Sequence, residues 1–79
     1  MEHEQRFDPE ALLTELEAAD FLKISHRALQ AWRVRGAGPA FVKVGRLVRY
    51  RRADLLDFCA SQTFASTSAA DAQRTEVRP

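Results

Sequence analysis

The sequence predicts a small, mainly α-helical domain that contains one β-hairpin. Two short stretches of helical apolar spacing each follow a residue suited to cap a helix, Thr14 and Ser25. A Gly-Pro segment then leads into an alternating, β-branched run, and another helical stretch follows at once. With 79 residues, the chain has room for at most one domain with a marginal core.

We expect residues 11–62 to form this domain, after a flexible acidic lead-in at residues 1–10. Residues 63–79 are mostly small and polar and are expected to be disordered. The only cysteine, Cys59, excludes an internal disulfide framework and a multi-cysteine metal site. There is no signal-peptide-like run and no apolar stretch near the roughly 20 residues that cross a bilayer, so we expect a soluble, intracellular protein without a membrane partner.

The first helix is predicted over residues 15–22. Thr14-Glu15-Leu16-Glu17 fits the capping box, in which the Thr hydroxyl accepts from the backbone N–H three residues on and Glu17 reaches back to the N–H of Thr14. The helix ends near Lys23, which is expected to cost about 1 kcal/mol if it adopts a left-handed conformation.

The second helix is predicted from about His26 to Arg35, with Ser25 as its N-cap and Gly36 in the left-handed position after it. Only about three residues separate it from the first helix, the length of a helix-turn-helix connection. Leu29 and Trp32 share a face and are expected to pack against the first helix. The side chains expected to look outward are His26, Arg27, Gln30 and Arg33.

Residues 40–51, AFVKVGRLVRYR, are predicted to form a β-hairpin. A two-residue loop, Gly45-Arg46, would pair Val44 with Leu47. A three-residue loop that adds Leu47 would pair Val44 with Val48 and separate an apolar face from a basic one, so we favour it. The apolar face would then hold Val42, Val44, Val48 and Tyr50, and the other face mostly Phe41, Lys43, Arg49 and Arg51.

The last helix is predicted over residues 52–59. Leu55, Phe58 and Cys59 form its expected inward stripe, and Asp54 is favourable in its first turn.

Charge is sharply divided along the chain. Residues 23–52 contain nine Lys and Arg side chains and no acid, whereas residues 1–22 contain seven acids and a single basic residue, Arg6. A basic stretch of this kind indicates a polyanionic partner. Arg33 and Arg35 could instead pair with the acidic first helix, Arg35 more readily than Arg33.

The order of helix, tight turn, helix, basic hairpin and helix is that of a winged helix-turn-helix. Residues 12–60 resemble the small excisionases, also called recombination directionality factors, and the AlpA-like phage regulators; the DNA-binding domain of MerR-type regulators is more distantly similar. The motifs are LLTELEAADFLKIS and RALQAWRVRGAGPAFVKVGRLVRYRRADLLDF, of which GPAFVKVGRLVRYRRADL is the most specific.

The resemblance implies that the second helix enters the major groove and that the hairpin is a wing on the neighbouring minor groove or backbone. The implied recognition-helix contacts are His26, Arg27, Gln30 and Arg33. The implied wing contacts are Lys43, Gly45, Arg46 and Arg49. Ser25, Arg51 and Arg52 are candidates for phosphate contacts. The family often has a second Arg at the wing tip, where this chain has Leu47.

The resemblance implies a cytoplasmic, nucleoid-associated protein of bacterial or phage-like type that binds double-stranded DNA. We expect no enzymatic activity, no catalytic residue, no cofactor and no metal. The leading hypothesis is an excisionase that binds and bends or organises attachment-site DNA, so that an integrase favours excision, with several copies binding cooperatively. The alternatives are a transcription regulator of a prophage or mobile element, and a protein-interaction adaptor.

Overall fold

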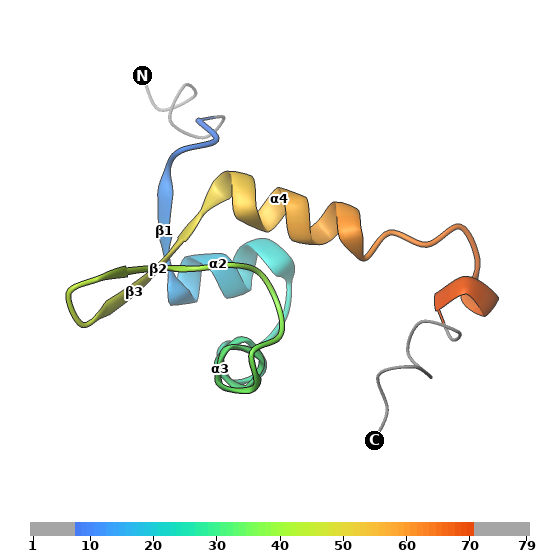
Figure 1. Ribbon diagram of the computed structural model, residues 1–79, viewed down its shortest axis with the longest axis horizontal. Coiled ribbons are helices and arrows are strands. Elements are labelled where there is room, and N and C mark those ends of the chain that lie inside the picture. The colour runs from blue at the N-terminus through green and yellow to red at the C-terminus, as the bar shows by residue number, and fades with distance from the viewer. Residues whose placement is uncertain (1–7, 71–79) are drawn as a thin grey trace.

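The computed structural model describes residues 8–70 and has the predicted mainly α-helical architecture with a small sheet (Figure 1). The elements in chain order are β1 (Leu12–Thr14), α2 (Glu15–Leu22), α3 (His26–Arg35), β2 (Val42–Val44), β3 (Leu47–Arg51) and α4 (Arg52–Ser61). This is a winged helix-turn-helix, with β2 and β3 as the wing. The lead-in and tail predictions concern residues that lie largely outside this range, namely 1–7 and 71–79; residues 67–70 are helical.

Local capping defines the first helix of the motif, as predicted. The Thr14 hydroxyl accepts from the N–H of Glu17 at 3.1 Å, and the Glu17 carboxylate accepts from the N–H of Thr14 at 2.9 Å. At the other end, Lys23 is left-handed (φ 59°), and its N–H donates to the carbonyls of Ala19 and Asp20. The strained turn expected at Lys23 is therefore present.

The second helix begins and ends at the predicted residues. The Ser25 hydroxyl accepts from the N–H of Ala28 at 3.0 Å, and Gly36 is the left-handed C-cap (φ 77°). Gly38 allows the chain to pass close to Trp32, because a Cβ at this position would lie 3.0 Å from both Cβ and Cε3 of the tryptophan. Trp32 also contacts α4, because its ring centroid lies 5.5 Å from that of Phe58.

Strand β1 was not predicted from the sequence. It pairs antiparallel with β3, so the strand order is β1-β3-β2, and Leu13 lies opposite Tyr50. The pairing extends beyond the strand ends, since the N–H of Arg52 donates to the Ala11 carbonyl and the N–H of Ala53 to the Pro9 carbonyl, both at 2.9 Å. These carbonyls accept hydrogen bonds from the first two backbone N–H groups of α4, whose N-terminus has no side-chain cap.

The predicted hairpin register is wrong. Val44 pairs with Leu47 and Val42 with Arg49, so the loop has two residues, Gly45 and Arg46, with Gly45 at φ 64°. The prediction assumed that every valine of the hairpin faces the core. Tyr50, which is 1% exposed, and Val48 do face the core as predicted, but Val42 and Val44 lie on the other side of the sheet.

The corrected register changes which side chains share a face. Directly opposite residues lie on the same side of a sheet and successive residues alternate. Lys43, opposite Val48, is therefore on the core-facing side with Tyr50, whereas Arg49 is on the other side. The hairpin has no single basic face.

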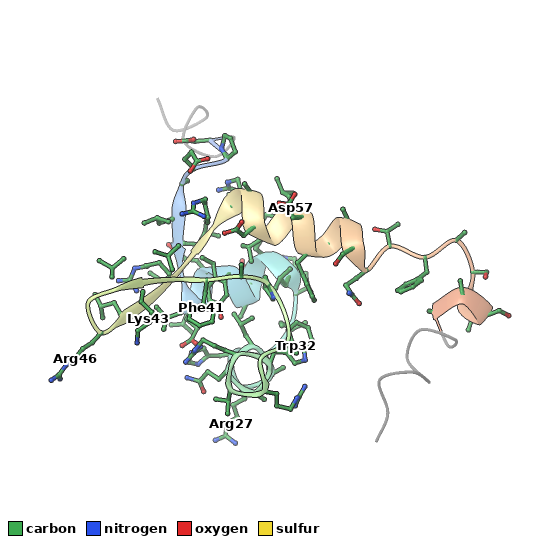
Figure 2. All side chains as sticks on the ribbon, viewed as in Figure 1. Arg27, Trp32, Phe41, Lys43, Arg46 and Asp57 are labelled. Carbon is green, nitrogen blue, oxygen red and sulfur yellow. The ribbon has the colours of Figure 1, made fainter. Side chains whose placement is uncertain are left out.

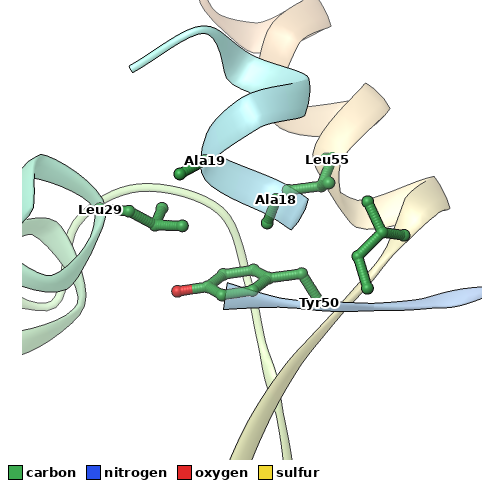
Figure 3. Packing of buried hydrophobic residues seen from close by; sticks show 6 residues of the cluster. Ala18, Ala19, Leu29, Tyr50 and Leu55 are labelled. Carbon is green, nitrogen blue, oxygen red and sulfur yellow. The ribbon is translucent and has the colours of Figure 1, made fainter. Parts of the chain in front are cut away.

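The core lies between the sheet, α2, α3 and α4. The ring of Tyr50 extends from β3 beneath Ala18 and Ala19 of α2 and towards Leu29 of α3, as Figure 3 shows. Within residues 8–70 the buried core cluster consists of Leu13, Ala18, Ala19, Leu29, Tyr50 and Leu55. Small alanines on α2 allow the Tyr50 ring to approach the helix closely.

The predicted inward stripe of α4 is only partly correct. Leu55 is buried and Phe58 is half-buried, but Cys59 is exposed. The final turns of α4 extend beyond α2 and the sheet (Figure 1), which agrees with the exposure of Cys59.

Replacing Lys23 with glycine is expected to stabilise the protein by about 1 kcal/mol, because glycine adopts the left-handed conformation without the Cβ clash. The exposed Lys23–Asp20 pair, at 4.0 Å, contributes little to stability. Gly36→Ala is the matched control with the opposite sign: its Cβ would meet nothing within 4 Å, so only the backbone strain is added. Thermal and urea unfolding measure both effects. A Lys23→Gly variant less stable than the wild type would contradict this account of the turn.

Candidate nucleic-acid interface

Helix α3 and the wing each carry an exposed arginine that points away from the core. Figure 2 shows Arg27 pointing away from the body of the protein on the outer side of α3, and Arg46 at the tip of the wing. Asp57, on α4, lies on the opposite side of the molecule. The surface that bears Arg27 and Arg46 is therefore the candidate for contact with a polyanion.

The predicted recognition-helix residues do not form one outward set, because three of the four contact Glu15. This carboxylate lies in the first turn of α2. His26 Nε2 lies 3.0 Å from Glu15 Oε1, and Gln30 Nε2 donates to the same oxygen at 3.4 Å. Arg33 Nη1 donates to the other oxygen, Oε2. We call this group the Glu15 cluster.

Arg33 is more enclosed than His26, whose side chain is 39% exposed. Its side chain is 21% exposed, that of Glu15 is 17% exposed, and the guanidinium also lies 5.8 Å from the ring centroid of Phe41. The expectation that Arg35 would pair with the acidic first helix more readily than Arg33 is therefore wrong. Sequence spacing could not show which arginine pairs with Glu15, because this depends on the rotation of α3 about its axis.

The outer face of α3 is formed by residues at helical spacing from Arg27. A shallow, open concavity on this face is lined by Arg27, Gln30, Ala31, Val34 and Arg35. Val34 is 82% exposed and was not among the predicted site residues. Val34 is seven residues after Arg27, and this spacing could have indicated that both lie on the same face of the helix. Gln30 belongs to this face and to the Glu15 cluster.

The wing presents fewer free cations than predicted. Lys43 and Arg46 are exposed, and Gly45 forms the turn between them. Arg49 is half-buried and donates from Nη1 to the carbonyl of Val48 at 2.8 Å. Leu47 is 53% exposed beside the tip, as expected, but it is the first residue of β3.

The candidate phosphate contacts all have partners within the protein. Ser25 caps α3. Arg51 pairs with Glu10 (Nε to Oε1, 3.3 Å) and with Asp54 (Nη1 to Oδ2, 3.1 Å). The guanidinium of Arg52 lies 5.8 Å from the ring centroid of Phe21, and its buried Nε has no hydrogen-bond partner. The side chains of Arg51 and Arg52 join α4 to the preceding elements.

Residues 8–70 contain neither a candidate metal site nor a candidate membrane-spanning helix. No group of three His, Cys, Asp or Glu side chains in this range is placed to hold a metal ion. No helix in the same range has the length and apolar character needed to cross a membrane.

Glu15→Gln is expected to lower the free energy of unfolding by about 2 kcal/mol, because it removes the charge-assisted bond to a largely buried arginine. Glu17→Gln is the matched control: it removes the same charge from the same helix, but glutamine can still make the capping-box bond. Urea unfolding compares the two. Equal stabilities would show that the Glu15 cluster does not hold the helices together.

Comparison with known proteins agrees with this arrangement. A family model described as a helix-turn-helix domain matches residues 12–63, which include every element from β1 to α4. A search of curated protein sequences found no match. The matched range is about two thirds of the chain, and the protein belongs to the helix-turn-helix domain family.

Proposed function

We propose that this protein is a DNA-binding excisionase, a recombination directionality factor that binds and bends or organises attachment-site DNA so that an integrase favours excision. The main supporting observation is the pair of exposed cations, Arg27 on α3 and Arg46 on the wing, held by one small scaffold (Figure 2). The match to the helix-turn-helix domain family supports DNA binding itself. The excision role rests on the sequence resemblance.

Recognition would divide between α3 and the wing. In the major groove, the Arg27 guanidinium can donate two bonds to guanine O6 and N7. The Gln30 amide can pair with adenine N6 and N7 once it leaves its long 3.4 Å bond to Glu15. Arg46 at the wing tip, with Lys43 behind it, suits the electronegative minor groove or the phosphates beside it. Arg49 would need to leave its bond to the Val48 carbonyl.

Contacts from the remaining predicted residues require exchange of partners. His26 and Arg33 would have to give up Glu15 to reach a phosphate, and Arg51 would have to leave Glu10 or Asp54. Such an exchange replaces one ion pair with another, so it adds less to affinity than a contact from an unpaired cation. We therefore assign the main contacts to Arg27, Gln30, Lys43 and Arg46, and minor ones to His26, Arg33, Arg49, Ser25, Arg51 and Arg52.

The small size of the domain suggests that several copies act together. A single module of this kind covers about 600–1,000 Å² of interface. Cooperative binding of neighbouring copies would supply the affinity and the DNA deformation that excision requires. The role needs no catalytic group, cofactor or metal from this chain, and places it with the DNA in the cytoplasm.

Two other roles are distinguished by experiment. A transcription regulator of a mobile element would use the same DNA-facing surface. A protein-interaction adaptor would instead use apolar surface, and Leu12, Val44 and Leu47, each about half exposed, lie on the face of the sheet away from the core.

In an excision assay with the partner integrase, adding the wild-type protein is expected to raise the excision frequency. Arg27→Ala is expected to abolish most of this stimulation, because loss of a bidentate base contact costs about 1–3 kcal/mol of specific binding. Asp57→Ala, on the opposite side of the molecule, should behave as the wild type. Unchanged excision on adding the protein, together with altered activity of a nearby promoter, would favour the regulator.

A further inference from the structure

Val34, in the last turn of α3, is an unusual residue for a basic, solvent-facing helix surface. Among residues 8–70 it is the most exposed large apolar side chain, at 82%, and it lies on the outer face of α3 with Ala31 three residues earlier. Polar or charged side chains surround this apolar pair on the same face: Arg27, Gln30 and Arg35. At 82% exposure the valine adds little to the packing of residues 8–70, so this part of the fold does not require it.

The major groove offers a partner for such a side chain. Besides hydrogen-bond donors and acceptors, it exposes the 5-methyl group of thymine, which apolar side chains recognise. Valine has one strongly preferred rotamer in a helix, so its methyl groups are presented in a fixed direction with little loss of entropy on binding.

We infer that Ala31 and Val34 read thymine methyl groups in the major groove and thereby help to determine the target sequence. This inference rests on the proposed DNA-binding function and deepens it. Seven residues of helix span about 10 Å at 1.5 Å per residue. At 3.4 Å per base pair, this corresponds to about three steps along the groove. The preferred site therefore has thymine within about three base pairs of the base read by Arg27.

The experiment begins by selecting the preferred site from random double-stranded DNA with the full-length chain. Each thymine of that site is then replaced in turn by deoxyuridine, which removes only the methyl group. For the wild type, the Kd is expected to rise about fourfold at one or two positions, the effect of withdrawing one methyl-sized contact. Val34→Ala should bind thymine DNA correspondingly more weakly and lose the thymine-to-uracil difference at one of these positions.

Val44→Ala is the matched control, because it removes the same atoms from a half-exposed valine on the wing. It should keep the wild-type ratio of thymine and uracil affinities. Equal wild-type affinity for thymine and uracil at every position would overturn the inference while leaving DNA binding intact.

Three other results are also decisive. A Val34→Ala variant that retains the full methyl effect at every position would overturn the assignment to Val34. A change in self-association on Val34→Ala, without a change in the methyl effect, would make Val34 a protein contact and also overturn it. Absence of any DNA binding would instead refute the proposed function.

Discussion

The docking of α3 onto the carboxylate of Glu15 decides which side chains this protein can offer to DNA. Glu15 lies in the first turn of α2, where the positive end of the helix dipole favours a negative charge. Its partners His26, Gln30 and Arg33 are four and then three residues apart, so they lie along one side of α3. Their contacts fix the rotation of α3 and leave Arg27, Ala31 and Val34 on the outer face.

The same cluster connects the recognition helix to the wing. Arg33 lies over the ring of Phe41, and the rings of Phe41 and Tyr50 are 6.2 Å apart between centroids. Tyr50 in turn is held in the core and pairs with Leu13 of β1. The position of the wing relative to α3 is therefore set by packed side chains between them. Arg33 is one of the basic side chains in residues 23–52, but Glu15 and Phe41 hold it within the fold. Fewer basic side chains are therefore available to a ligand than the sequence contains.

Sequence reasoning succeeded where structure is determined locally. Thr14, Ser25 and Gly36 each act on backbone groups within a few residues, so both helices of the motif could be predicted to the residue. It failed where the local structure depends on contacts with a segment distant in the sequence. Strand β1 has only three residues and no period of its own, and its identity comes from pairing with β3. The hairpin register was wrong for β2 alone, because the prediction placed Val42 and Val44 on the same side as Tyr50, whereas the two-residue loop places them on the other side. The partner of Arg33 and the exposure of Val34 depend on the rotation of α3 about its axis, which the sequence does not show.

The central claim is that the basic side chains divide into those held by the protein and those available to DNA. The most direct measurement is the slope of log affinity against log salt concentration for DNA binding by the wild type, Arg46→Ala and Arg51→Ala. We expect a steep negative wild-type slope, a slope less steep by about 0.9 for Arg46→Ala, the value for one lost phosphate contact, and an unchanged slope for Arg51→Ala. A flat wild-type slope, or an equal loss of slope in both variants, would contradict the division.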